Sequence, residues 1–182
     1  MLSMKASEDL RNEHELIKVT LHVLDQVVRQ ITQGEQVDVT DLQDIIGFLS
    51  EFADKCHHGK EEGFYFPALE KAGIPKEGGP IGVMLAEHDL GRSNIRQMRE
   101  SVSGANIDLQ TFAQAAMSYT SLMSNHIEKE NNVLFMMGDM RLPEETQKEL
   151  LEKFEEHEKN VIGEGRHQEL HALLEKLEQK YL

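Results

Sequence analysis

The sequence predicts an all-α protein, and three features of the chain lead to this prediction. Only 4 prolines occur in 182 residues, and aromatic residues make up 5% of the chain. Leu, Glu, Lys, Gln, Ala and Met dominate long segments, and these residues favour helices. Within those segments apolar residues recur three and four positions apart, which is the spacing of one helix face. We therefore expect helices throughout and no strands.

Clusters of Gly, Asn, Asp and Pro divide the helical pattern into segments. These breaks fall at QGEQVDVTD, AGIPKEGGPIG, SGANIDLQ and GDMRLPEE. They leave four main helices and a helical tail broken at GEG, at about residues 7–33, 40–72, 80–103, 108–138 and 143–180. Because short connections place successive helices antiparallel, we predict an up-down-up-down antiparallel four-helix bundle over residues 1–142. Residues 143–182 are expected to form an additional C-terminal helical segment packed on the bundle.

Composition and charge exclude several classes of function. The 33 acidic residues outnumber the 19 basic residues and leave a formal net charge of −14. A nucleic-acid partner is not expected, because neutralising phosphates requires a basic surface. No apolar run approaches the roughly 20 residues that cross a bilayer, and the N-terminus lacks the apolar centre of a signal peptide. We therefore expect a cytoplasmic protein with no membrane partner, in agreement with a single cysteine, Cys56.

Several expected helix faces carry polar residues where a bundle core should be apolar. One imidazole interrupts the apolar series of the first helix, and another interrupts that of the third. The second and fourth helices each carry a His and a Glu four residues apart, and such a pair projects from nearly the same face. The inward-facing candidates are His14, His57, Glu61, His88, His126 and Glu130.

Two buried carboxylates require a strong partner. An uncompensated buried ion costs several kcal/mol, whereas a folded domain is stable by only about 5–15 kcal/mol in total. A metal cation held among the six side chains meets this requirement. Four imidazoles and two carboxylates that can bridge suit two transition ions better than one tetrahedral zinc, which needs only four donors. We predict a dinuclear centre, for which iron, manganese and zinc are all suitable by ligand type.

The register of the second helix leaves one choice open, because His58 and Glu62 have the same spacing as His57 and Glu61. Comparison of HHGKE with HIEKE in the fourth helix favours His57 and Glu61, since Lys then precedes Glu in both. His58 is then a group beside the centre or an additional ligand. The neighbouring Cys56 is expected to pack rather than react.

Ferritin-type di-iron bundles use a different motif, in which a His follows a Glu by three residues. This pattern occurs at Glu164 and His167, inside GEGRH. Its two glycines oppose a helix, so we do not expect a metal site there.

These motifs resemble the hemerythrin-like, or HHE cation-binding, proteins, which are four-helix bundles that hold a non-haem di-iron centre. The resemblance covers about residues 7–140 and rests on EHELI, HHGKEEGFYFP, AEHDLGR and HIEKENNVLFM. It implies that the iron ligands are four terminal histidines and two bridging carboxylates, namely His14, His57, His88, His126, Glu61 and Glu130. Glu13 and Glu87, next to two of these histidines, are candidates to orient ligands, although a surface charge is the simpler expectation for each.

The chain departs from the oxygen-carrying members of that family. Those members use five histidines, two of them four residues apart on the third helix, where this chain has Met84 and Arg92. The resemblance therefore implies a four-histidine centre, of the kind in members that sense iron or repair iron centres damaged by nitric oxide. Three histidines of the tail are expected to be solvated rather than to ligate, namely His157, His167 and His171.

Four hypotheses of function follow from this pattern. The leading one is a non-haem di-iron protein that binds or responds to O2, NO, peroxide or iron, in sensing, stress defence or iron-centre repair. Two alternatives within metal chemistry are an O2 storage or carrier protein and a di-iron oxidase, peroxidase or NO reductase, so the sequence leaves open whether the protein is an enzyme. The fourth is a structural bundle stabilised by metal, in which zinc would replace iron without loss of function.

Overall fold

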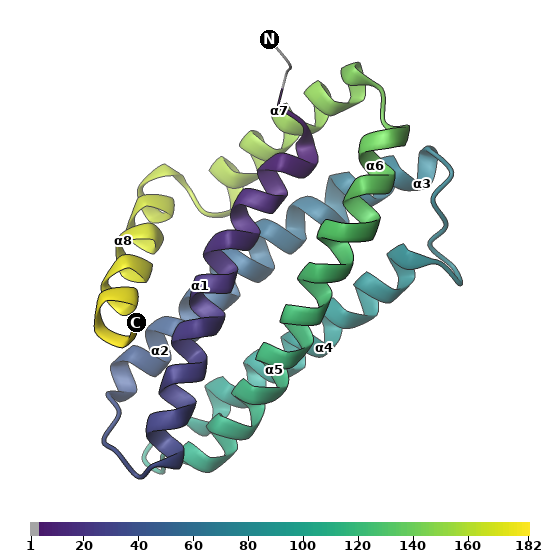
Figure 1. The fold of residues 1–182 in the computed structure, drawn as a ribbon. Coiled ribbons are helices and arrows are strands. Elements are labelled where there is room, and N and C mark those ends of the chain that lie inside the picture. Colours follow the sequence, from purple (N-terminus) through teal and green to yellow (C-terminus); the bar gives the residue numbers. More distant parts are fainter. Residues whose placement is uncertain (1–3) are drawn as a thin grey trace.

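The computed structural model describes residues 4–182, and its regular elements over that range are all helices (Figure 1). Three of them are π-helices (η), in which backbone hydrogen bonds run from i to i+5. In chain order the elements are α1 (Ala6–Thr32), α2 (Val39–Phe48), η1 (Leu49–His58), η2 (Glu61–Tyr65), α3 (Phe66–Lys71), α4 (Pro80–Ser101), α5 (Leu109–Lys129), η3 (Glu130–Leu134), α6 (Phe135–Arg141), α7 (Glu144–Val161) and α8 (Glu164–Tyr181). None of these helices is long and apolar enough to span a bilayer.

The long helices lie side by side and form a helical bundle, in which α5 packs along both α4 and α1. The breaks between helices fall where Gly, Asn, Asp and Pro cluster in the sequence. Asp38 caps α2 by accepting a hydrogen bond from the backbone N–H of Thr40 (2.9 Å), and Asp108 caps α5 by accepting one from Thr111 (3.0 Å). Such side chains satisfy backbone donors that have no partner inside the helix.

The two predicted helices that carry a His and a Glu are wound differently from the expected α-helix. The second is π-helical over Leu49–His58 and again over Glu61–Tyr65, and the fourth is π-helical over Glu130–Leu134. A π-helix turns the chain less per residue than an α-helix, because each hydrogen bond encloses one more residue. Both predicted bridging carboxylates are the first residue of a π-helix, since Glu61 begins η2 and Glu130 begins η3.

The apolar interior is divided into two clusters of buried side chains. One is centred on residues such as Leu24, Phe52 and Tyr119, and the other contains Leu10 and Phe135. A layer of buried polar residues lies between the two clusters along the bundle, and α1, η1, α4 and α5 contribute to it. Burial of the two apolar clusters supplies the hydrophobic stabilisation that allows this polar layer to exist.

The C-terminal helices cover one side of the bundle (Figure 1). Helix α7 contacts α1, η1 and η2, and α8 contacts α1 and α2. The side chain of Gln147 on α7 accepts a hydrogen bond from the backbone N–H of Ala6 (2.9 Å), and Leu150 and Phe154 are buried against the bundle. The division of the chain at residue 142 stays a prediction.

Gly138→Ala should destabilise the protein by about 1–3 kcal/mol, because its new methyl group would overpack the interface between α6 and the η2–α3 segment. A Cβ atom at this position would lie 2.9 Å from Leu69 Cδ2 and would also overlap the hydroxyl group of Tyr65. Urea denaturation monitored by circular dichroism measures the effect.

Gly47→Ala is the matched control, because a Cβ atom there meets nothing within 4 Å. It should stabilise α2 by about 0.5–1 kcal/mol through helix propensity. Equal effects of the two substitutions would contradict the close approach of α6.

Candidate metal centre

The six side chains predicted from the sequence converge in the polar layer. His14 comes from α1, His57 from the end of η1, His88 from α4 and His126 from α5, while Glu61 and Glu130 begin η2 and η3. Each of the six is at most 1% exposed. They lie in two adjacent groups that share Glu61.

The first group consists of His14, His57, Glu61 and Glu130, whose possible ligand atoms all lie within 4.8 Å of one another. His14 Nε2 is 3.1 Å from Glu130 Oε2, and His57 Nε2 is 3.4 Å from Glu61 Oε1. This group is called the His14–His57 half below.

The second group consists of His58, His88, His126 and Glu61, again within 4.8 Å of one another. His88 Nε2 is 3.2 Å from Glu61 Oε2, and His126 Nε2 is 3.3 Å from Glu130 Oε1. This group is called the His88–His126 half. Each of the two carboxylates therefore directs one oxygen toward each half, which is the arrangement that a carboxylate bridge requires.

The buried polar atoms of this layer fit a pair of metal ions. His14 Nε2, His57 Nε2 and all four oxygens of Glu61 and Glu130 are buried without a hydrogen-bond partner. Buried polar groups in folded proteins nearly always have a partner. Here the unpartnered lone pairs are concentrated in one place, so cations between the two halves would satisfy them together.

Every imidazole of the centre has its Nδ1 atom beside an oxygen acceptor outside the two halves. The pairs are His57 with Glu13 (2.8 Å), His88 with Glu62 (2.7 Å), His126 with Glu87 (2.8 Å), His14 with the Asn131 amide oxygen (2.8 Å) and His58 with Asp54 (3.4 Å). Donation from Nδ1–H to such an acceptor leaves Nε2 with a free lone pair and fixes the plane of the ring.

For two of these acceptors, Glu13 and Glu87, the simpler expectation from the sequence is a charge on the surface of a helix. The structure instead shows them in the orienting role, since each accepts a hydrogen bond from an imidazole. Glu13 is buried, with 7% of its surface exposed.

Arg92 and Glu62 also lie beside the centre. Arg92 donates from Nε to Asp54 (2.8 Å) and from Nη2 to Glu62 (2.7 Å), so it holds two of the acceptors. Glu62, the bridge in the alternative register, accepts the hydrogen bond of His88 Nδ1. Glu61, rather than Glu62, therefore faces both halves.

His58 is outside the six predicted site residues, although the sequence left it open as a group beside the centre or an additional ligand. Its ring stacks on that of His88 with a centroid separation of 3.8 Å and belongs to the second group. Spacing by 3.6 residues places His57 inward and its neighbour outward, but the π-helical winding of η1 brings both rings into the interior. The sequence signal was the HH doublet itself, which raises the number of imidazoles at the centre to five.

The histidines of the tail lie away from the two halves. His157 donates from Nε2 to the backbone carbonyl of Lys55 (3.0 Å), and His167 Nε2 lies 3.2 Å from Glu158. His171 faces Phe52 edge-on. None of the three belongs to either half.

Mutual pairing strongly perturbs the acid–base properties of the centre. Burial disfavours charge on His57, but Glu61 and Glu13 outweigh it and raise its pKa to about 10. Burial likewise opposes charge on His88, yet the adjacent carboxylates of Glu61 and Glu62 raise its pKa to about 9. His58 behaves oppositely, because burial and the neighbouring imidazoles lower its pKa well below the ordinary value.

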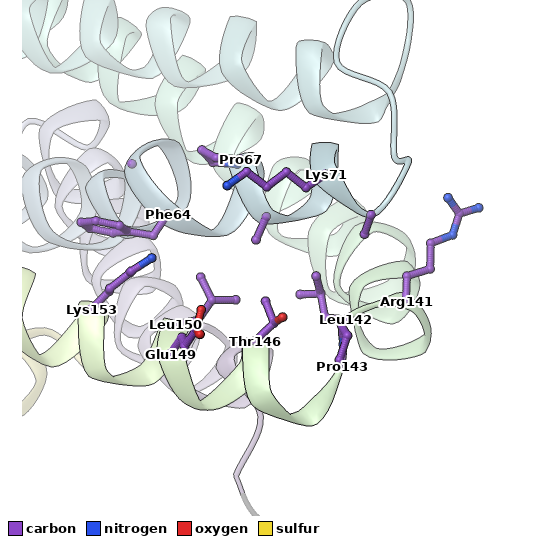
Figure 2. A pocket seen from close by; sticks show the side chains of 13 residues that line it. Phe64, Pro67, Lys71, Arg141, Leu142, Pro143, Thr146, Glu149, Leu150 and Lys153 are labelled. Carbon is purple, nitrogen blue, oxygen red and sulfur yellow. The ribbon is translucent and has the colours of Figure 1, made fainter.

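A cavity of about 500 Å³ lies between the η2–α3 segment and α7, apart from this layer. Figure 2 shows that Phe64 and Leu150 line it together with Lys71 and Lys153. None of the six predicted site residues lines the cavity. The metal centre is therefore a buried layer between helices rather than the floor of this pocket.

The fold and the polar layer together define a helical bundle with a buried cation-binding centre. The chain belongs to the hemerythrin HHE cation-binding domain family, whose model matches residues 5–138. The resemblance noted from the four motifs is thereby confirmed.

The chain is also similar to uncharacterized proteins of Mycobacterium bovis and Mycobacterium tuberculosis, with 27% identity over 165 residues. The alignment covers 88% of this chain and 64% of each relative. The chain therefore spans less than two thirds of the length of these curated relatives. No solved structure matches it significantly.

The metal-free protein should lose stability as the pH rises from 6.5 toward 10. The folded-state pKa values of His57 and His88, about 10 and about 9, lie above their ordinary value of 6.5. Their protonated forms therefore contribute stability that is complete below pH 6.5 and is lost as the pH passes the folded pKa values. Denaturant unfolding at pH 6 and pH 9.5 measures this loss.

Acid should also destabilise the metal-free protein, through Glu13. Burial opposes its charge, but hydrogen bonds and charge from His57 and Lys60 outweigh burial and lower its pKa from 4.5 to about 2. Its contribution is present above pH 4.5 and is lost as the pH falls toward 2. Denaturant unfolding measured from pH 4.5 down to 2 tests this, and a stability that stays constant over that range would contradict the pairing of Glu13. A stability that stays constant from pH 6 to 9.5 would contradict the pairing of His57 and His88.

Proposed function

We propose that this chain is a non-haem di-iron protein with the two ions held in an up-down-up-down four-helix bundle. The proposed ligands are the six predicted residues, joined by His58 in the His88–His126 half: His14, His57, Glu61, His88, His126 and Glu130. The observation that carries the proposal is the pair of buried carboxylates whose four unpartnered oxygens face both halves. Manganese or zinc would suit the same donors.

The two halves offer unequal numbers of donors. The His14–His57 half has two imidazoles, whereas the His88–His126 half has three. With both carboxylates shared, the first half leaves more room for water or a small ligand. A small diatomic molecule or peroxide is the ligand class that such a half accepts.

Two ferrous ions, when bound, supply two electrons together and permit reduction of O2, NO or peroxide without release of a radical. The chain itself contributes orientation and exclusion of water. Phe135 stacks on the His14 ring with a centroid separation of 5.4 Å, and Phe66 stacks on His88 at 5.8 Å. Both aromatic rings are nearly fully buried, so they shield the imidazoles from bulk solvent.

A route to the centre is favoured on the face formed by η1 and α4. A cavity of about 730 Å³ there is lined by Asp54, which is the acceptor of His58, and by Arg92, which holds Glu62, the acceptor of His88. Lys55 and Arg96 line the same cavity. A small ligand entering by this route would reach the Asp54–Arg92 pair before the histidines.

The leading role is sensing, stress defence or iron-centre repair in the cytoplasm, with O2, NO, peroxide or iron as the signal or substrate. Storage of O2 is the second candidate, and His58 is the observation that favours it. His58 supplies the fifth imidazole that Met84 and Arg92 do not provide on α4. Steady turnover with a reductant would instead identify an oxidase, peroxidase or reductase.

Purified protein should contain about two metal ions per chain, with iron preferred when iron is abundant. Glu61→Ala should lose both ions because Glu61 faces both halves, whereas His14→Ala should retain one. His22→Ala, at an exposed position of α1, is the control and should retain two. Elemental analysis after dialysis measures the stoichiometry, and a metal-free protein of undiminished thermal stability would contradict the proposal.

Exposure of the ferrous protein to air should oxidise the centre in a way that removal of oxygen does not reverse, because the less crowded His14–His57 half would leave room for water beside the ions. His58→Ala should oxidise faster than the unmodified protein. Repeated oxygenation and argon purging, followed by visible absorption, measures both. Full recovery of the ferrous spectrum over many cycles would favour O2 storage instead.

A further inference from the structure

A fully buried lysine lies next to the proposed metal centre. Lys60 is 1% exposed and immediately precedes Glu61. Its Nζ atom donates to Glu13 Oε1 (2.7 Å), Asp9 Oδ2 (3.1 Å) and Glu158 Oε2 (3.4 Å). The first two acceptors lie on α1 and the third on α7, so one ammonium group joins three parts of the chain.

Lys60 continues a line of contacts that ends at the metal centre. One oxygen of Glu13 accepts from Lys60, and the other accepts from His57 Nδ1 (2.8 Å). The opposite nitrogen of His57, Nε2, faces Glu61 Oε1 at 3.4 Å. Because both Glu13 oxygens are engaged, Glu13 cannot rotate without breaking one contact, and its position fixes the plane of the His57 ring.

The same order of imidazole, carboxylate and cation occurs twice more around the centre. His88, Glu62 and Arg92 form one series, and His126, Glu87 and Lys129 form the other. The side chains of Arg92 and Lys129 are 35% and 44% exposed, whereas that of Lys60 is 1% exposed. Charged hydrogen bonds are stronger when water is excluded, so the buried series holds its imidazole most firmly.

Helix α7 is the reason that Lys60 is buried. The Phe154 ring lies 5.6 Å from Lys60 Nζ, and Glu158 contributes one of the three carboxylates. Burial of an ammonium group is costly unless carboxylates surround it, and α7 supplies both the cover and one partner. Helix α7 lies outside residues 5–138, the part that the family model matches.

Three further residues, Glu13, Cys56 and Glu158, lie close enough together to hold a metal ion, but the Lys60 ammonium group already pairs with the two carboxylates. Lys60 Nζ lies within hydrogen-bond distance of both of these carboxylates and so occupies the place of a cation there. The Cys56 thiol is fully buried and remains a packing group.

We infer that Lys60 is a positioning residue for the His14–His57 half of the centre, and that Glu158 of α7 completes its setting. Helix α7 is then part of the setting of the metal site. This inference rests on the proposed metal centre.

Lys60→Met removes the ammonium group and keeps most of the side-chain length. We expect one of the two ions to bind roughly 10- to 100-fold more weakly, as for other residues that orient metal ligands, while the other ion binds as before. Equilibrium dialysis against Mn²⁺ followed by elemental analysis measures both affinities. Lys129→Met, which removes the exposed cation of the His126 series, is the matched control and should leave the His14–His57 half unchanged.

A second readout needs no metal. In the metal-free protein, ¹⁵N-resolved NMR should show His57 Nδ1–H strongly shifted by its hydrogen bond with Glu13. The shift should be lost in Lys60→Met and kept in Lys129→Met. A purely structural role for Lys60 would lower the unfolding temperature without moving this signal.

Glu158→Gln provides a milder test that stands if Lys60→Met does not fold. It should weaken the same ion about tenfold, whereas Glu155→Gln, an exposed neighbour on α7 paired with Lys159, should have no effect. Wild-type affinities and an unchanged His57 signal in Lys60→Met, or in Glu158→Gln if Lys60→Met does not fold, would overturn the inference. A wild-type protein that binds no metal would instead overturn the proposed function. The NMR comparison would still test whether Lys60 positions His57 through Glu13.

Discussion

The burial of two carboxylates, Glu61 and Glu130, is the constraint on which the rest of the structure depends. An ionised carboxyl group inside a protein must be compensated by charge and hydrogen bonds, because its loss of hydration is far larger than the stability of the fold. Five imidazoles surround the two carboxylates, and unpartnered oxygens remain between the two halves. The centre is thus built to receive positive charge, whether from protons or from metal ions.

The layers around this centre alternate in sign. Imidazoles face inward, oxygen acceptors hold their Nδ1 atoms, and three cations hold four of those acceptors in turn. Each layer reduces the cost of burying the one inside it. Two apolar clusters, above and below the polar layer along the bundle, supply the hydrophobic stability that this arrangement requires.

The π-helical segments connect local backbone geometry to the chemistry of the site. Glu61 and Glu130 both stand at the start of a π-helix, and η1 presents two consecutive histidines to the interior. Such segments are rare and are frequently found at functional sites. In this chain they allow two helices to supply five of the seven polar groups at the centre, namely His57, His58, Glu61, His126 and Glu130.

The sequence by itself determined the helical class and the main breaks, and it placed six His and Glu residues on inward helix faces, because the spacing of side chains on one helix is a local property. The tertiary structure alone decided the roles of His58, Glu13, Glu62 and Lys60. The winding of η1 directs His58 inward, and the acceptors of the imidazoles come from neighbouring helices. The contact of α7 with Lys60 joins residues 98 positions apart in the chain. Such pairings depend on how helices pack, which no repeat within a single helix encodes.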